Sequence, residues 1–573
     1  MTPFLRHLAR SILPSAALLA LCVPGFCSTA VPREAPGGYG SYLAGEEALR
    51  NLSTGDAARY LRDANAAQND PVVEQRAFLA YLANGDIDRA VVVANRLLAD
   101  RPDFLMGKLV VAISELKDRR YGAVEKLLDG MPTDDFVGIS AGIIRAWSFI
   151  GDGRKDDAVT TLARASKPGL EGFINFHQGL MDAVAGDGAA AVTLAGKAYE
   201  SNSTAPRMVE AYARALGNAD RFDDALAIID RFNAQGLGDP QVDAVQKALL
   251  AHQHPGLFAT SAQAGASELL HGIAIELVRN GDIDDAMALL QLGLYLDPRD
   301  DGIPLLIGQL LDNAGQHAAA NGFYASIPDS SPMNLTAQIR IAQNYDDMNN
   351  RPEALQRLAA LAAKNPDNRT ALTALGEMLR TDKQYDAAAK AYSQALALDK
   401  TDLERDWVLY YQRGIAYERA NEWTKAEPDF LKALALEPDQ PQVLNYLGYT
   451  WVDRGVNLDK GFDMIQRAVK ATPNDGFIVD SLGWAYFKLN KFDNAVTTLE
   501  QAVQLKPNDP QINDHLGDAY WKAGRKLEAH FQWNIAASLD TDGTLKTSLA
   551  AKQANGLDKP ATTSAAATPT TTQ

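Results

Sequence analysis

From Asp475 to Asp540 the sequence reads DGFIVDSLGWAYFKLNKFDNAVTTLEQAVQLKPNDPQINDHLGDAYWKAGRKLEAHFQWNIAASLD. One pattern occurs twice in it: Leu-Gly, Tyr, Ala, a large residue and Ala, with matching positions 34 residues apart. Its members are Leu482, Gly483, Tyr486, Ala495, Leu499 and Ala502 in the first copy and Leu516, Gly517, Tyr520, Ala529, Trp533 and Ala536 in the second. A fixed period of this length indicates a repeated structural element.

Each repeat is predicted to be a pair of antiparallel helices. Val479, Leu482 and Tyr486 are spaced i, i+3, i+7, which places them on one face of a first helix. After the polar break at 488–491, small alanines beside a large leucine form a second face that lets the helices pack closely. Pro507 ends the repeat, because proline does not easily continue a helix. One pair cannot cover its own apolar faces, so neighbouring pairs must stack.

This pattern resembles the tetratricopeptide repeat (TPR), and the resemblance covers residues 39–545. It implies an all-α fold, an α-solenoid in which about fourteen helix-turn-helix repeats form a right-handed superhelix. Prolines at the closing position of the repeat agree with it, because they recur at 298, 332, 366, 438, 473 and 507.

The repeat pattern divides the chain. Residues 31–240 are predicted to hold a TPR-like array of six repeats, three of them degenerate, and residues 267–545 a second array of eight. The period fails between them, and we expect a joint at 241–266. Residues 546–573 are predicted to be a disordered tail rich in threonine and alanine.

Residues 1–30 have the features of a secretory signal peptide. Arg6 and Arg10 give a positive start, Ile12–Val23 is a short apolar core, and small residues precede a cleavage site after Ala30. We therefore expect an exported protein of the bacterial periplasm, with association to the outer membrane as one form of this location. No other stretch is long and apolar enough to predict a membrane span.

Both cysteines, Cys22 and Cys27, lie in this leader. The mature chain would therefore have no disulfide, no thiol nucleophile and no cysteine metal ligand. The alternative to plain cleavage is a lipid anchor on one of these cysteines. Leu21 and Phe26 count against it, because a bacterial lipobox needs a small residue before the cysteine.

Charge and motifs argue against nucleic-acid binding and catalysis. The net charge is −17, which disfavours DNA, RNA and anionic membrane surfaces. His252 and His254 form a metal-like pair, but they precede a proline after a helix and have no further ligand nearby in sequence. There is no P-loop, nucleophile elbow or paired-acid motif. We expect no enzyme activity, no cofactor and no metal site.

The resemblance implies where a partner would bind. In TPR arrays, positions 2, 5, 9, 12 and 13 of each first helix face a concave groove. Carried onto this sequence, the residues of interest are Tyr411, Asn445, Tyr449, Asp480, Trp484, Phe487, Asp514, Asp518 and Trp521. Such an aromatic strip suits a peptide, and its acids favour a neutral or basic segment. The alternative is that these aromatics pack internally, against the next turn or a folded-back terminus.

The residues at position 5 of the repeat differ from those in one known type of TPR groove. Arrays that clamp a C-terminal carboxylate use asparagine and basic residues there, whereas this chain has Asn445 but also Asp480 and Asp514. A carboxylate clamp is therefore not expected.

The sequence thus predicts a non-enzymatic scaffold of the bacterial cell envelope that binds peptide or protein segments in its groove. The second array also resembles exported proteobacterial multi-TPR proteins, at Asn445–Tyr449, Asp480–Trp484 and Asn513–Asp518. The alternative function is a glycan-binding or polysaccharide-export accessory of the cell wall, because aromatic strips with carboxylates also suit sugars. The sequence names neither the partner nor an oligomeric state.

Overall fold

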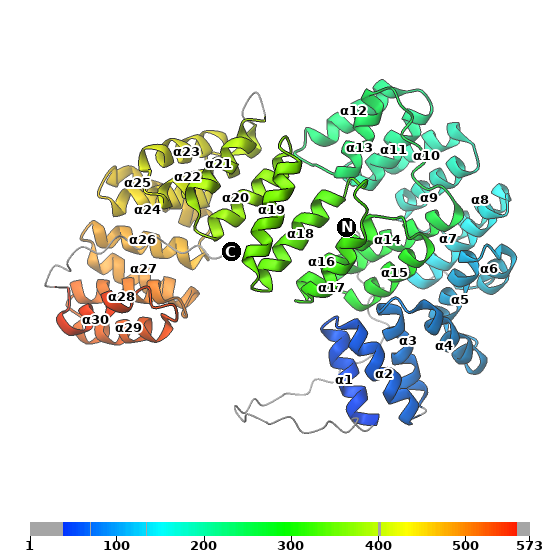
Figure 1. Ribbon diagram of the computed structural model, residues 1–573, viewed down its shortest axis with the longest axis horizontal. Helices are drawn as coiled ribbons and strands as arrows, with labels where there is room; N and C mark the ends of the chain where they lie inside the picture. The colour runs from blue at the N-terminus through cyan, green and yellow to red at the C-terminus, as the bar shows by residue number, and fades with distance from the viewer. Residues whose placement is uncertain (1–37, 69, 133–134, 399–402, 558–573) are drawn as a thin grey trace. The chain divides into compact units, whose positions relative to one another are not determined.

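A computed structural model describes residues 38–68, 70–132, 135–398 and 403–557 (Figure 1). These ranges form helices and turns and contain no strand. The chain divides into two compact units, Met1–Arg357 and Leu358–Gln573. The predicted signal peptide lies outside the described residues, as does the Thr/Ala-rich end from residue 558. None of the helices in the described ranges combines the length and hydropathy that crossing a membrane requires.

The helices of the first unit are α1 (Gly38–Arg50), α2 (Thr54–Gln68), α3 (Pro71–Ala83), α4 (Ile87–Asp100), α5 (Leu105–Lys117), α6 (Tyr121–Leu128), α7 (Phe136–Gly151), α8 (Lys155–Ala165), α9 (Glu171–Val184), α10 (Gly188–Ser201), α11 (Pro206–Asn218), α12 (Phe222–Asn233), α13 (Pro240–Leu250), α14 (Ala262–Asn280), α15 (Ile283–Leu296), α16 (Gly302–Asn313), α17 (His317–Ser326) and α18 (Asn334–Asp347). Helix α19 (Arg351–Lys364) contains the boundary between the units.

The second unit continues with α20 (Arg369–Thr381), α21 (Tyr385–Leu396), the short 3-10 helix η2 (Glu404–Asp406), α22 (Trp407–Arg419), α23 (Trp423–Leu436), α24 (Pro441–Asp453), α25 (Leu458–Ala471), α26 (Gly476–Lys488), α27 (Phe492–Leu505), α28 (Pro510–Lys522), α29 (Lys526–Leu539) and α30 (Lys546–Asn555).

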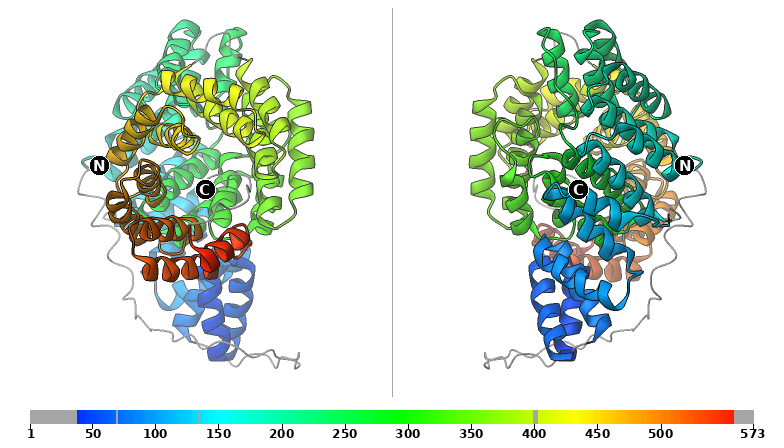
Figure 2. Two further views of the ribbon diagram at one scale, coloured as in Figure 1. Left: turned by 90° about the vertical axis from the view of Figure 1, so that its left-hand side faces the viewer. Right: turned by 90° about the vertical axis from the view of Figure 1, so that its right-hand side faces the viewer.

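The predicted helix pairs are confirmed. Six consecutive pairs, α1 to α12, precede the single helix α13, and eight pairs, α14 to α29, follow it. The left view of Figure 2 shows the later pairs, coloured yellow to red, stacked one after another. The Leu-Gly motif has a steric reason. A Cβ on Gly483 would lie 2.5 Å from Leu499 Cγ, and one on Gly517 would lie 2.4 Å from Trp533 Cδ1, so only glycine lets the paired helices approach this closely.

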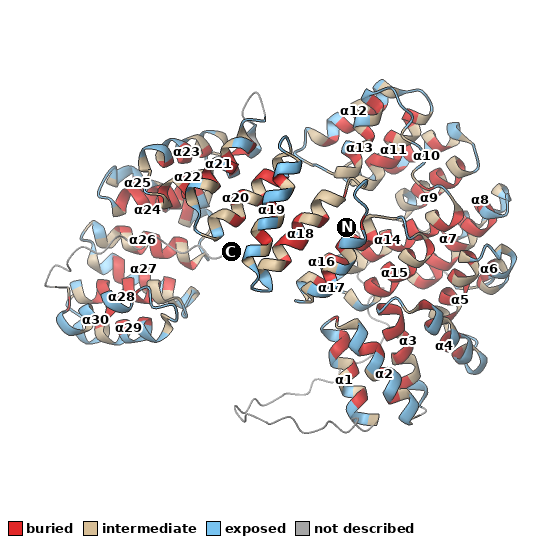
Figure 3. Cartoon of the chain, in the orientation of Figure 1, coloured by how far each residue is buried: buried red, intermediate tan, exposed pale blue. Residues whose placement is uncertain are grey.

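In the first unit, α14 and α15 pack mainly against the first helices of earlier pairs. Helix α14 contacts α7, α9 and α5, and α15 contacts α3, α5 and α4. Gln263 Nε2 donates to the carbonyl of Leu116 (2.9 Å), and Lys117 Nζ donates to that of Leu296 (3.2 Å). Gly265 of α14 lies directly over the fully buried Trp147 of α7. The start of the second array is therefore part of the first unit's core, as the buried residues along α7, α14 and α15 show (Figure 3).

The segment predicted as a joint contains α13 and irregular chain at 251–261. Helix α13 packs on α11 and α12. His254 stacks on Phe222 (ring centroids 5.9 Å apart) and lies 2.8 Å from Asp220, while Asn218 Nδ2 donates to Gly256 O at 3.0 Å. The histidine pair thus packs on α12 and the turn before it.

The second unit ends in a helix that the sequence analysis placed in the disordered tail. Residues 546–555 form α30, which packs on α29. Leu545 and Leu549 are buried, and the side chain of Lys552 reaches back to α28. The prediction of a tail from 546 is therefore wrong for these residues. The segment is short and polar in sequence, and it is held by contacts with the preceding repeat.

Candidate functional site

A groove of about 890 Å³ lies on the concave face of the second unit. It is lined by first helices of successive pairs, α20, α22, α24, α26 and α28, and by the loops that precede them. Tyr411, Asn445 and Asp480 of the predicted binding residues line it. Tyr411 is half-buried against the rings of Phe430 and Tyr446, and its burial raises its pKa to about 12.

Three polar atoms on the groove wall are shielded from solvent and have no hydrogen-bond partner within the described protein. They are Arg380 Nε, Gln412 Oε1 and Asn445 Oδ1. A buried polar atom without a partner typically costs about 1–3 kcal/mol, so such atoms are uncommon in a folded protein. Their grouping in one groove indicates a surface suited to a polar ligand.

The carboxylates of the groove are already engaged within the chain. Asp475 accepts from the N–H of Phe477 (3.0 Å) at the start of α26, and Asp509 accepts from that of Ile512 (2.9 Å) at the start of α28. Asp480 lies 2.9 Å from Nδ1 of His515. The side chains of Arg380 and Lys506 remain as the cationic groups of the groove.

Trp484 and Phe487 belong to an internal stack. The indole of Trp484 lies between Phe487 (4.8 Å between centroids) and His515 (4.2 Å), with its Nε1–H donated to Asp453 Oδ1 at 3.3 Å. Burial alone would lower the pKa of His515, but Asp480 beside it raises that pKa above its usual value. Tyr449 is buried next to this stack, and its burial raises its pKa well above the usual range.

Asp514, Asp518 and Trp521 contact the terminal helix α30 and the residues after it. Lys552 Nζ lies 2.7 Å from Asp514 Oδ1 and 2.8 Å from Asp518 Oδ2. A Cβ on Gly556 would lie 1.9 Å from Trp521 Cζ2. Burial, and then the neighbouring Asp514, raise the pKa of Asp518 to about 6. These three residues therefore pack against a folded-back terminus. Such internal packing is the alternative given above for the aromatic strip.

The side chains of the groove that sequence reasoning missed include Arg380, Gln412 and Lys506. Gln412 follows a position assigned to the groove, so a wider choice of positions would have included it. Arg380 lies near the end of its helix, and Lys506 lies in the loop before α28. Only fixed positions of the first helices were considered, and this left the loops out.

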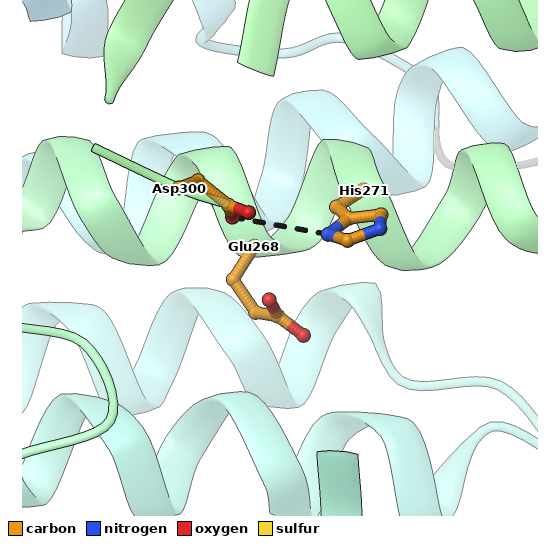
Figure 4. A group of neighbouring side chains, drawn as sticks. All are labelled: Glu268, His271 and Asp300. Carbon is orange, nitrogen blue, oxygen red and sulfur yellow. Dashed lines mark ion pairs between the residues drawn. The ribbon is translucent and has the colours of Figure 1, made fainter. Parts of the chain in front are cut away.

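A buried cluster of Glu268, His271 and Asp300 in the first unit has metal-ligand side chains within 4.8 Å of one another (Figure 4). Arg207 Nε donates to Glu268 Oε1 at 2.7 Å, so a cation already lies beside that carboxylate. Asp300 Oδ1 accepts from the N–H groups of Gly302 and Ile303, at the start of α16. The groups therefore form an ion-pair network that joins α11, α14 and α16.

The charges of this network explain the titration of Asp300. Burial alone would raise its pKa, but His271, Arg207 and the N–H of Ile303 together hold it well below its usual value.

Replacing Glu268 by glutamine is expected to destabilise the first unit by about 2 kcal/mol, because it leaves the Arg207 guanidinium without its close counter-charge. Urea unfolding followed by circular dichroism measures the change. Asp224→Asn is the control, since its pair with Arg221 is half-exposed on both sides, and it should cost less than about 1 kcal/mol. Equal losses in the two variants would mean that the buried network adds no stability.

Sequence comparisons identify the repeats. Models of the tetratricopeptide repeat match residues 339–402 and 407–440, and a TPR repeat model matches 483–524. A TPR repeat-containing protein of Pseudomonas aeruginosa is 30% identical over 190 residues, which cover 33% of this chain and 31% of that protein. The alignment thus spans about a third of the relative's length.

Solved structures with similar helical arrangements include three TPR proteins or assemblies. A chain of the APC/C hetero-tetramer Cut9-Hcn1 is 16% identical, covers 90% of this chain and 96% of that one, and has a TM-score of 0.39. Yeast Tom70 is 15% identical, with 91% and 95% covered and a TM-score of 0.31. YrrB, described as a TPR protein with an unusual peptide-binding site, is 19% identical, with 33% and 96% covered and a TM-score of 0.26.

The helix pairs, their 34-residue period and the family models agree with one another. The chain therefore contains tetratricopeptide repeats within residues 339–440 and 483–524, and helix pairs continue through the other described residues.

Proposed function

We propose that the groove of the second unit binds an extended polypeptide segment, and that the chain serves as a non-enzymatic scaffold in the bacterial cell envelope. TPR repeats indicate a protein-interaction scaffold. The observation that carries the groove proposal is the set of unpaired atoms on its wall, Arg380 Nε, Gln412 Oε1 and Asn445 Oδ1. These atoms are shielded from solvent, so an extended backbone would pair with them after the side chains rotate toward it, with its N–H groups donating to the two amide oxygens and its carbonyl oxygens accepting from the arginine.

The charge of the preferred segment differs from that expected from sequence. Asp480, Asp514 and Asp518 were expected to select a neutral or basic peptide, but each is already close to a basic side chain of the chain itself. Arg380 and Lys506 instead favour a neutral or acidic segment, mainly through the rate of association and through specificity. The glycan-binding alternative depended on the aromatic strip and its carboxylates. In that strip Trp484 is half-buried against His515, and Trp521 is half-buried against Trp533.

A photo-crosslinking residue at position 445 tests the proposal in cells. We expect adducts with other proteins, whereas the same residue at exposed position 466 on the outer helix α25 should give none. Adducts within the chain alone would argue against the groove. Cell fractionation of the same samples tests the envelope location, and recovery in the cytoplasm would contradict it.

With a crosslinked partner segment in hand, the double variant Gln412→Ala/Asn445→Ala is expected to weaken binding by about 30-fold, because two hydrogen bonds of about 1 kcal/mol each are lost. The free protein should keep its stability, since neither oxygen is paired in it. Gln466→Ala is the matched control and should bind as the parent does. Unchanged binding by the double variant would exclude the groove as the binding surface.

A further inference from the structure

A second cavity, of about 970 Å³, lies on the concave side of the first unit beside α14 and α15. Its walls come from the ends of α1, α3 and α7, from α9, α11 and α14, and from the start of α15. Figure 1 labels these helices. Apolar side chains supply most of the inner surface, among them Leu79, Phe136, Ile139, Phe173, Ile273 and Leu277. A concave, mostly apolar site of this size is typical of binding pockets.

Carboxylates gather where α14 ends and α15 begins: Glu276, Asp282, Asp284 and Asp285. Burial raises the pKa of Asp284, and burial together with Asp284 and Asp282 raises that of Asp285. Two of the four therefore carry their charge at a cost in free energy that a bound cation would offset.

The basic groups of the cavity do not neutralise this charge. Burial raises the pKa of Asp284, and the positive charge of Arg76 partly offsets this rise. However, the guanidinium of Arg76 donates two hydrogen bonds to the carboxylate of Glu46, at 2.6 and 2.7 Å. Arg50 lies 3.4 Å from Glu47. Neither Asp284 nor Asp285 makes a side-chain hydrogen bond or ion pair with another described residue. The cavity thus combines an apolar wall with an excess of negative charge at one end.

We propose that this cavity binds a short polypeptide segment in which apolar side chains alternate with lysine or arginine. The apolar side chains lie against the walls formed by α3, α7 and α14, and a basic side chain reaches Asp284 and Asp285. Charge complementarity selects this occupant, because an acidic segment would add repulsion to two carboxylates that are already costly to ionise. The site is separate from the groove of the second unit and does not depend on the function proposed for it.

The chain contains its own control for the acidic residues. The sequence Asn-Gly-Asp-Ile-Asp occurs at 84–88 and again at 280–284. Asp88 is the second residue of α4, as Asp284 is of α15, and both are exposed, but Asp88 lies outside the cavity. Replacing Asp88 by asparagine therefore removes one charge from the same helix position, after the same four residues, and leaves the cavity unchanged.

The test uses the full chain and a fluorescein-labelled hexapeptide of alternating leucine and lysine, followed by fluorescence polarisation. We expect saturable binding, and at least about tenfold weaker binding by Asp284→Asn/Asp285→Asn. Asp88→Asn and the groove variant Gln412→Ala/Asn445→Ala should bind as the parent does. Hexapeptides of leucine with glutamate, and of serine with lysine, should each bind at least about tenfold more weakly.

A second variant separates loss of binding from loss of structure. A Cβ on Gly272 would meet only Phe173 Cε2, at 3.5 Å, so Gly272→Leu places a side chain in the cavity and keeps both carboxylates. It should block the peptide as well. The proposal is overturned if both cavity variants bind the leucine–lysine peptide as the parent does, or if Asp88→Asn weakens binding as much as the double variant does. Equal binding of the serine–lysine peptide would also overturn it, since that shows attraction to net charge alone.

Discussion

Replacing Lys552 by methionine is expected to release α30 from the second unit at pH 8. The Lys552 ammonium lies within 2.8 Å of Asp514 and Asp518, whose side chains are 8% and 7% exposed. Without it, two neighbouring buried carboxylates have no ammonium beside them, which costs about 3–5 kcal/mol. A helix of ten residues avoids this cost by detaching, since its only buried residue is Leu549 and its contact with α28 includes the ion pairs that are lost.

The pH dependence of this variant has a definite sign. The pKa of Asp518 is raised to about 6 in the folded protein, so its stability contribution is present at low pH and is lost as the pH rises through that value. Removing Lys552 raises this pKa further. The deficit of the variant should therefore be small near pH 5, where one carboxyl holds a proton, and large at pH 8.

Hydrogen exchange of the amides in α30 measures the release, and tryptophan fluorescence follows Trp521 as it loses the cover of Gly556. Lys546→Met is the matched control, because Lys546 is an exposed residue of the same helix. Equal protection of α30 in the two variants at pH 8 would show that the ion pairs do not hold it.

The same substitution at two positions of α14 should have opposite effects on the first unit. A Cβ on Gly265 would lie 2.1 Å from Cζ2 of the fully buried Trp147, so Gly265→Ala forces α14 away from α7 and costs about 2–3 kcal/mol. At Gly272 the nearest atom is 3.5 Å away, and Gly272→Ala should stabilise the helix by about 0.5–1 kcal/mol.

Urea unfolding followed by circular dichroism measures the free energy of unfolding of the two variants. The pair shares helix, residue type and substitution, so the difference reports the contact with Trp147 itself. A loss of less than about 0.5 kcal/mol for Gly265→Ala would mean that α14 is not held against α7 in solution.

The repeat pattern in the sequence predicts those helix contacts that recur from one repeat to the next. Glycine at 483 and at 517 is needed because the two helices of each of these pairs cross closely, so it recurs with the period and reveals the pairs. A contact that occurs only once in the structure produces no periodic pattern in the sequence. Gln263 reaches Leu116 and Lys552 reaches Asp514 through single side chains, and no spacing in the sequence announces either.

The binding residues show the same limit. Family positions identified Tyr411, Asn445 and Asp480 as lining the groove, because the fold of a repeat fixes which way they face. The partners of Asp480, Asp514 and Asp518 depend on which neighbouring repeat carries a histidine and on where the chain ends. The charge of the groove therefore could not be inferred from its own residues.

The packing of α14 and α15 inside the first unit also sets how that unit folds. Its side-chain hydrogen bonds join residues 147, 179 and 208 positions apart, whereas Trp484, His515 and Lys552 in the second unit reach partners only 31 to 38 positions away. Folding slows as contacts become more distant in sequence. We expect the second unit to grow from any repeat outward. During synthesis, the concave face of the first six pairs is covered only after the chain has been made as far as residue 296, where α15 ends. The apolar surface of these pairs is exposed until then.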